Sequence, residues 1–150
     1  MENISQTIFN ELEKDLHENA QSTLIVSGGS SPVQIFKDLS AMQTKWSDIT
    51  ISLVDDRVVD IKHDDSNEKL VNDLLIKDAA KDANFISICT QSKDLLNLKR
   101  PFGVMLLGMG EDGHFASLFP RLIETNPEYF DLESDAEIFF TEPMGNPCHK

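Results

Sequence analysis

The sequence contains only two cysteines, Cys89 and Cys148, among its 150 residues. They are too few and too far apart to indicate a disulfide framework, and neither belongs to a CxxC pair. No window approaches the roughly 18 consecutive apolar residues that a membrane span requires. The amino terminus is acidic and amphipathic, without the basic start and apolar block of a secretory signal. These absences favour a cytoplasmic protein with no membrane partner.

Basic residues are also scarce, since 13 lysines and arginines stand against 26 aspartates and glutamates and give a formal net charge of -13. Such a field repels the phosphates of nucleic acids and anionic membrane surfaces, and no basic stripe offsets it. We therefore expect no nucleic-acid partner. Solubility alone also explains this acidity. A phosphorylated metabolite would be weakly repelled, so any anion site must act through short-range donors.

The apolar residues that are present alternate between helical and extended patterns. Ile4, Ile8, Leu12 and Leu16 recur every four residues and predict an amphipathic first helix. A second helix is predicted to begin with Pro32 at its first position and Ser31 as its N-cap. Further helices are predicted over residues 67–76 and 93–99, and strands over residues 23–27, 49–55, 85–88, 103–108 and 137–142.

Strands that alternate with helices predict an α/β fold with a mostly parallel sheet flanked by helices. We expect a single such domain over residues 1–150, a length that suffices for a real hydrophobic core. The apolar run at residues 103–108 is typical of a strand covered on both faces. Because the chain stops directly after its last predicted strand, with no closing helix, we expect the fold to lack its C-terminal part.

Three polar loops follow predicted strands directly, and the carboxyl ends of parallel strands meet at one edge of a sheet. The first loop is "SGGSSP", in which Gly28 and Gly29 allow a tight turn whose amides point toward an anion before the second helix. Ser30 and Ser31 add hydroxyl donors. A simple strand-to-helix turn with a capping serine explains the loop equally well. It is not a P-loop, because the GxxxxGK[ST] spacing and its lysine are missing.

The second loop is "DDRVVD", at the end of an apolar strand. Arg57 could bind phosphate through its planar guanidinium, with Asp55 or Asp56 orienting it or contacting substrate hydroxyls. A salt bridge at the edge of the sheet is the alternative interpretation.

The third loop lies in "LLGMGEDGHFASLFP", where Gly108, Gly110 and Gly113 satisfy the G-x-G-x-x-G spacing of dinucleotide-binding folds. Three features argue against that interpretation. The motif follows a late strand rather than the first, the segment after it is soon interrupted by Pro120, and no following strand ends in a well-placed ribose-binding acid.

His114 is a better candidate for chemistry in this loop. A histidine among glycines at the end of a strand is accessible, and near neutral pH it can take a proton from water. Asp112 or Glu111 could hold its tautomer and support the imidazolium that forms. A lone histidine is often only structural, but this one lies where three candidate loops converge. The other three histidines share no ligand spacing with it, so no metal site is predicted.

The three motifs together resemble the 6-phosphogluconolactonase family in order and spacing. The resemblance covers "LIVSGGSSP", "DDR" followed by "SN" at Ser66 and Asn67, and "LLGMGEDGHFASLFP", or roughly residues 24–120. The family is grouped with glucosamine-6-phosphate deaminases and is related in fold to ribose-5-phosphate isomerase, which implies a modified Rossmann-like architecture. Its members hydrolyse 6-phospho-D-glucono-1,5-lactone to 6-phosphogluconate in the oxidative pentose phosphate pathway, without a cofactor.

The resemblance implies a binding role for the residues of the first two loops. Gly28, Gly29 and Ser30 would bind the phosphate or line its pocket. Arg57 would hold the phosphate or the anionic product, with Asp55 beside it. The partner implied is a small sugar-phosphate lactone, bound by a monomer or a homodimer.

The third loop would supply the catalytic group. His114, supported by Asp112, would draw a proton from the water that attacks the lactone carbonyl, and would return it to the ring oxygen. Gly110 would belong to the substrate-binding set. This chain departs from the family at Gly103, where an aspartate is usual, and at Phe115, where a threonine is usual. Family chains are also longer, so we expect this one to resemble their N-terminal two thirds.

Two rival functions remain. Sugar-phosphate deaminases carry "MDEY" where this chain has "VDDR", and an "NEP" glutamate where it has "LFP". A chain that binds sugar phosphate without turning it over is the second rival.

Overall fold

The computed structural model describes residues 3–131, 133, 135 and 138–142. The helices are α1 (Ile4–Asn19), α2 (Val33–Ala41), α3 (Asn67–Leu74), α4 (Ser92–Leu96) and α5 (Leu122–Thr125), and short 3-10 turns are η1 (Trp46–Asp48), η2 (Asp78–Asp82) and η3 (Pro127–Phe130). The strands are β1 (Ser22–Val26), β2 (Ile49–Leu53), β3 (Asn84–Phe85) and β4 (Val104–Leu106). No helix in these residues is long and apolar enough to cross a membrane.

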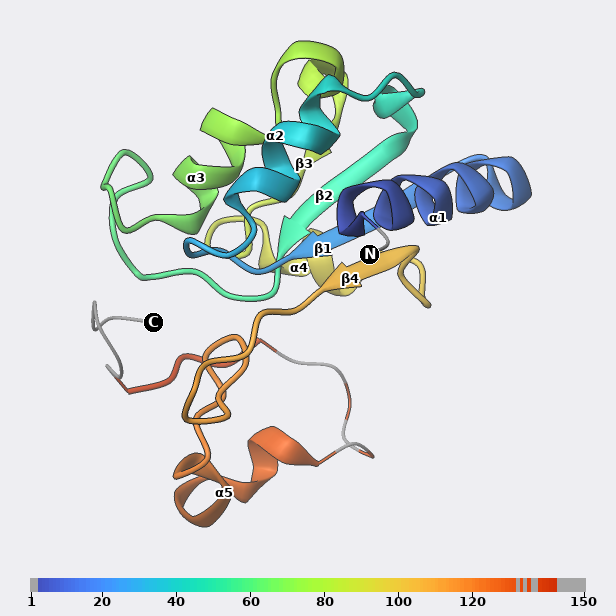
Figure 1. Ribbon diagram of the computed structural model, residues 1–150. Helices are drawn as coiled ribbons and strands as arrows, with labels where there is room; N and C mark the ends of the chain where they lie inside the picture. The colour runs from blue at the N-terminus through green and yellow to red at the C-terminus, as the bar shows by residue number, and fades with distance from the viewer. Residues whose placement is uncertain (1–2, 132, 134, 136–137, 143–150) are drawn as a thin grey trace.

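The strands form one parallel sheet in the order β3-β2-β1-β4. Leu24 at the centre of β1 lies opposite Ile51 of β2 and Val104 of β4. The predicted α/β fold with a mostly parallel sheet is therefore confirmed. The strands run toward the same edge, and the segment that follows β4 lies beyond it (Figure 1).

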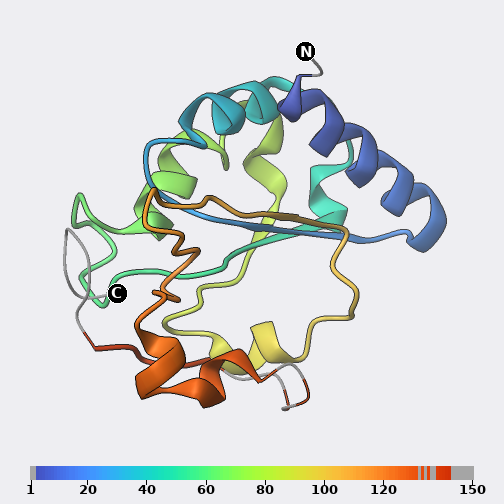
Figure 2. The ribbon, with the colours of Figure 1, turned by 60° about the horizontal axis from the view of Figure 1, so that its bottom comes forward.

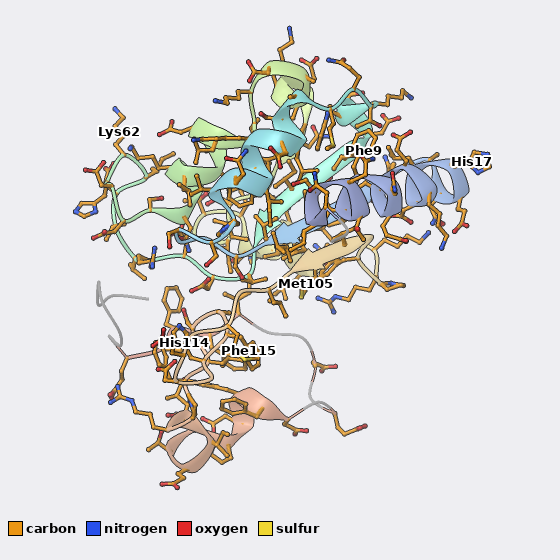
Figure 3. All side chains as sticks on the ribbon, viewed as in Figure 1. Phe9, His17, Lys62, Met105, His114 and Phe115 are labelled. Atoms are coloured by element: carbon orange, nitrogen blue, oxygen red, sulfur yellow. The ribbon has the colours of Figure 1, made fainter. Side chains whose placement is uncertain are left out.

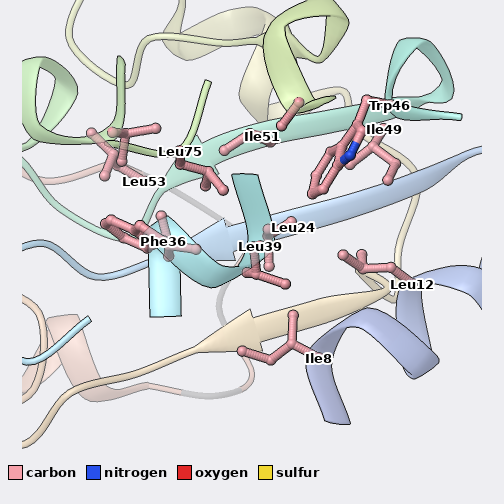
Figure 4. Packing of buried hydrophobic residues seen from close by; sticks show 13 residues of the cluster. Ile8, Leu12, Leu24, Phe36, Leu39, Trp46, Ile49, Ile51, Leu53 and Leu75 are labelled. Carbon is pink, nitrogen blue, oxygen red and sulfur yellow. The ribbon is translucent and has the colours of Figure 1, made fainter. Parts of the chain in front are cut away.

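The core lies between the sheet and its helices. Alternate side chains of β1 and β2 point toward α1, α2 and α3, which lie on one side of the strands, with α4 on the other (Figure 2). Phe36 and Leu39 of α2 are fully buried against this face, and Trp46 of η1 is 2% exposed (Figure 4). Ile8 and Leu12 of α1 are buried as the four-residue spacing predicted.

Side-chain caps fix the starts of α1 and α3 but not of α2. Asn3 Oδ1 accepts from the Ser5 amide at 3.0 Å, and Ser66 Oγ accepts from the Lys69 amide at 3.1 Å. The predicted Ser31 cap of α2 is wrong. Pro32 occupies the cap position instead, since its carbonyl accepts the first helical hydrogen bond, from Phe36, and its apolar ring makes no side-chain bond.

Two other predictions need correction. β4 is not covered on both faces, since Met105 is 48% exposed. In the described part of the chain, the five-residue α4 is the one helix on the second face of the sheet, whereas the longer α1, α2 and α3 lie on the first (Figure 2). The strand predicted at residues 137–142 is not found in residues 138–142, where no strand pairing is present, and residue 137 lies outside the described part. Apolar composition alone does not make a strand when no neighbour takes up its backbone hydrogen bonds.

Candidate active site

A cavity of about 290 Å³ lies at the carboxyl ends of β1, β2 and β4. It brings together the three loops that follow these strands. Of the site residues predicted from the sequence, all but Asp112 line it. The lining consists of Ser27, Gly28, Gly29, Ser30, Ser31, Asp55, Arg57, Asn67, Gly108, Met109, Gly110, His114, Ala116 and Phe119.

The glycine–serine turn is fixed to the neighbouring strand. Ser27 donates its amide to the Leu106 carbonyl at 2.9 Å, and its Oγ accepts from the Gly108 amide at 3.1 Å. Gly29 has a φ of 87°, a conformation that favours glycine. Within the described residues, the amides of Gly29 and Ser30 have no hydrogen-bond acceptor. The turn therefore offers free N–H donors ahead of α2, as an anion site requires.

Arg57 reaches the cavity from the loop after β2. Its Nη1 donates to the Asp65 carbonyl at 2.9 Å and to Asn67 Oδ1 at 2.7 Å. Its Nε is buried and has no partner among the described residues. Neither of the two aspartates before it forms an ion pair with its guanidinium in the described part of the chain. The backbone carbonyl of Asp65 and the side-chain carboxamide of Asn67 thus take the orienting role that was predicted for these acids.

The two aspartates have different surroundings. Asp56 accepts from the Asn67 amide at 2.7 Å and from the Glu68 amide at 3.0 Å, so it satisfies orphan donors at the start of α3. Asp55 lines the cavity, and its Oδ2 accepts from Ser117 Oγ at 2.7 Å. Asp56 stabilises the loop, whereas Asp55 is available to a ligand.

His114 is held by a carboxylate and an aromatic ring. Its Nδ1 lies 2.5 Å from Asp112 Oδ1, and its ring stacks on Phe119 with centroids 4.4 Å apart and planes inclined by 17°. The hydrogen bond from His114 lowers the pKa of Asp112 below its ordinary value. An ionised carboxylate only accepts, so Nδ1 carries the proton and Nε2 is left as the basic nitrogen. Asp112, rather than Glu111, is the acid in contact with the ring.

The backbone between Gly110 and His114 is a tight turn. The Gly110 amide donates to the His114 carbonyl at 2.8 Å, and the Gly113 amide donates to the Gly110 carbonyl at 2.9 Å. A side chain at Gly110 would overlap both the imidazole and Asp112. No helix begins until α5, so the G-x-G-x-x-G spacing does not place a helix N-terminus against a phosphate. The dinucleotide interpretation finds no support in this geometry.

Phe115 follows His114 directly in the chain but does not line the site cavity. Phe115 and His114 occupy the loop after β4, while His17 lies at the far end of α1 (Figure 3). The Phe115 side chain lines an apolar hollow with Met105 on the second face of the sheet and not the site cavity. The family's threonine at this position thus has no counterpart in the cavity lining.

Sequence reasoning did not assign roles to Asn67, Ser117 and Phe119. Asn67 appeared in the "SN" motif, but nothing in a helix-start pattern indicates that its side chain faces an arginine. The described residues contain no group of three or more histidine, cysteine, aspartate or glutamate side chains that could hold a metal ion.

Comparison with known proteins gives consistent matches. The sequence profile of the family described as "Glucosamine-6-phosphate isomerases/6-phosphogluconolactonase" matches residues 1–140. A 6-phosphogluconolactonase of Helicobacter pylori is 39% identical over 145 residues, which cover 90% of this chain and 61% of that protein. One of Rhizobium meliloti is 41% identical over 110 residues, or 66% of this chain and 47% of the relative. The chain thus spans less than two thirds of the length of these curated relatives.

Solved structures agree. A 6-phosphogluconolactonase from Shewanella baltica has a TM-score of 0.76 at 35% identity, covering 81% of this chain and 58% of the other. The structure of 6-phosphogluconolactonase from Thermotoga maritima has a TM-score of 0.80 at 25% identity, covering 97% of this chain and 68% of the other.

Proposed function

Because the chain belongs to the family of glucosamine-6-phosphate isomerases and 6-phosphogluconolactonases, we propose that this protein hydrolyses 6-phospho-D-glucono-1,5-lactone to 6-phosphogluconate. One observation carries the proposal. The base His114, the cation Arg57 and the open amides of the glycine–serine turn line one cavity of about 290 Å³. A sugar phosphate needs a cation and N–H donors at one end and an acid–base group at the other, and this cavity offers both.

Binding would rely on short-range donors. The chain carries a net charge of -13, so its long-range field does not attract a phosphate. The amides of Gly29 and Ser30 and the guanidinium of Arg57 act at hydrogen-bond distance, where charge-assisted bonds are strong. We assign the phosphate to this end of the cavity and the lactone ring to the end formed by the third loop.

The reaction follows from the contact between His114 Nδ1 and Asp112, which leaves Nε2 to face the substrate water. Nε2 takes a proton from a water molecule, whose oxygen forms a bond to the lactone carbonyl carbon. The resulting tetrahedral adduct collapses, the bond between that carbon and the ring oxygen breaks, and the proton passes from the imidazolium to the departing ring oxygen. Asp112 holds the ring orientation and supports its positive charge. A single acid–base group contributes about 10²–10⁴-fold, which suits an already activated ester.

The direct test is a lactonase assay with a no-enzyme control, because the lactone also opens spontaneously. We expect formation of 6-phosphogluconate above the control rate, reduced at least about 100-fold by His114→Ala. His17→Ala is the matched control, since His17 is exposed and lies at the far end of α1 (Figure 3). Equal loss of activity in both variants would contradict the assignment.

A second candidate is sugar-phosphate binding without turnover. The cavity favours it as well, because Arg57 and the open amides of the glycine–serine turn would bind a sugar phosphate whether or not His114 turns it over. Calorimetry with 6-phosphogluconate separates the two cases, because saturable binding with no rate above the control would support the binding protein. Ammonia release from glucosamine-6-phosphate would instead support the deaminase.

The protein would act in the cytoplasm as a monomer or homodimer, with a small sugar-phosphate lactone as its partner and neither nucleic acid nor a membrane.

A further inference from the structure

Asn67 is the first residue of α3 and is only 3% exposed. Its backbone amide donates to Asp56 Oδ1 at 2.7 Å, which fixes the position of its Cα at the helix start. Its side chain bonds in two directions. Oδ1 accepts from Arg57 Nη1 at 2.7 Å, and Nδ2 donates to the Asp55 carbonyl at 3.0 Å. A carboxamide suits this arrangement, because it carries an acceptor and a donor on separate atoms.

The same side chain lies directly under the glycine–serine turn. A Cβ at Gly28 would overlap the carboxamide of Asn67. The residue therefore touches the loop after β1 and the loop after β2 at once, and it also lines the cavity.

The bonds of Arg57 explain why this contact matters. Among the described residues the guanidinium has two acceptors, Asn67 Oδ1 and the Asp65 carbonyl, and both bind Nη1, while Nε is buried without a partner. The orientation of the guanidinium is therefore fixed by the two hydrogen bonds at Nη1. Asp65 belongs to an irregular loop, whereas Asn67 begins a helix and is anchored by bonds to Asp56 and the Asp55 carbonyl. Asn67 is the better-fixed of the two acceptors.

We propose that Asn67 is a positioning residue, which aims the Arg57 guanidinium at the anionic end of the ligand and keeps it in register with the turn at Gly28. This inference rests on the proposed function, because it assumes that Arg57 binds the phosphate. Asn67 acts through Arg57 and does no chemistry on the lactone. Its loss should thus weaken binding of phosphorylated ligands and leave the hydrolytic step nearly intact.

The test compares Asn67→Ser and Asn67→Ala with Asn72→Ala as the matched control. Asn72 lies on the same helix and is exposed, and its side chain donates to the Glu68 carbonyl and does not line the site cavity. A hydrogen bond to a charged group is worth about 10–100-fold in an equilibrium constant. We expect the Asn67 variants to raise KM and the inhibition constant of 6-phosphogluconate by at least about tenfold, with kcat changed less than about threefold. The Asn72 variant should match the parent chain.

Two further measurements exclude a merely structural effect. Hydrolysis of the unphosphorylated gluconolactone should be little affected, because that substrate has no group for Arg57. In the double variant Arg57→Ala with Asn67→Ser, binding should be no weaker than in Arg57→Ala alone, since one residue acts through the other. Additive losses, or equal losses for both lactones, would overturn the inference.

The positioning role of Asn67 can be tested even if the chain proves not to be a lactonase. If the parent chain binds 6-phosphogluconate but does not hydrolyse the lactone, the lactonase proposal fails, and the same variants are compared by calorimetry. Unchanged affinity in folded Asn67→Ser would then overturn the positioning role. If the parent chain neither binds nor hydrolyses, both proposals fail.

Discussion

Ser117 Oγ donates a hydrogen bond of 2.7 Å to Asp55 Oδ2, across 62 positions of sequence. Asp55 lines the site cavity from the loop after β2, and Ser117 lies three residues after the candidate base His114. The bond thus couples the loop that carries the base to the loop that carries Arg57. Two ends of one ligand must be held at a fixed separation for catalysis, and this contact helps to set it.

Ser117→Ala removes the donor and frees the loop that carries the base. We expect kcat for the lactone to fall by about three- to tenfold, because small misplacements of a reacting group are costly. KM should change less, since the phosphate end is untouched. Steady-state kinetics would measure both, with the exposed Ser47→Ala as the control. Unchanged kcat in Ser117→Ala would show that the two loops keep their spacing without this bond.

The contact between Asp112 and His114 predicts a titration. The hydrogen bond from the imidazole is the main cause that lowers the pKa of Asp112 below 3.8. Because the folded pKa is depressed, the stabilisation from this pair is present above 3.8 and is lost as the pH falls through the lower folded value. The carboxyl carbon of Asp112, followed by NMR, should titrate below 3.8 in the parent chain, and its pKa should rise in His114→Ala, which loses the imidazole but keeps the backbone amide that also bonds Asp112.

Asp38 is the internal control for that experiment. Its pKa is lowered mainly by the hydrogen bond from Ser5 and secondly by Gln34, neither of which lies near the histidine loop. His114→Ala should leave the Asp38 titration unchanged. If Asp112 titrated identically with and without the imidazole, the assignment of Nδ1 as its donor would be wrong.

The sequence was sufficient for features that depend on local pattern. Alternating strands and helices predicted the parallel sheet, and loops that follow parallel strands had to meet at one edge, so Gly28, Arg57 and His114 could be expected at one cavity. Prediction from sequence pattern failed where packing by residues distant in the sequence determines whether a strand is buried. Met105 is apolar and follows the strand pattern, but what packs on the second face of the sheet cannot be inferred from residues 103–108.

Side-chain partners were the least predictable feature of the site. Arg57 was expected beside an aspartate, because opposite charges attract, but its acceptors are Asn67 and a carbonyl. Asp56 is occupied by the amides at the start of α3, which sequence alone does not show to be within reach. Pairings of this kind depend on how a loop of about ten residues folds back, and neither hydrophobic period nor motif spacing encodes that path.

The two glycines of the first turn should tolerate alanine differently. Gly28→Ala would push its Cβ into Asn67, while Gly29→Ala has open space but keeps a φ of 87°. We expect Gly29→Ala to cost about 1–2 kcal/mol of stability with the cavity intact. Gly28→Ala should displace the Asn67 carboxamide that binds Arg57. We expect it to weaken 6-phosphogluconate binding at least about tenfold in calorimetry. Equal affinities for the two variants would mean that Asn67 can move without consequence.

Burial of α2 behind the glycine–serine turn predicts a stability difference between two phenylalanines. Phe36 is fully buried between α2 and the sheet (Figure 4). Phe115, by contrast, is 37% exposed and lines the hollow on the second face. Phe36→Ala removes a large buried side chain and leaves a cavity, so its free energy of unfolding should fall by about 3–5 kcal/mol. Phe115→Ala loses less apolar burial and should cost clearly less.

Urea unfolding followed by fluorescence of Trp46 would measure both values, because this single tryptophan is 2% exposed in the same core. Phe115→Ala should also keep lactone hydrolysis, since its side chain does not line the site cavity. Phe36→Ala should lose activity only in step with its folded fraction, because Phe36 supports α2 without touching the ligand space. If both variants lost the same stability, α2 would not be the packed support that holds the anion-binding turn in place.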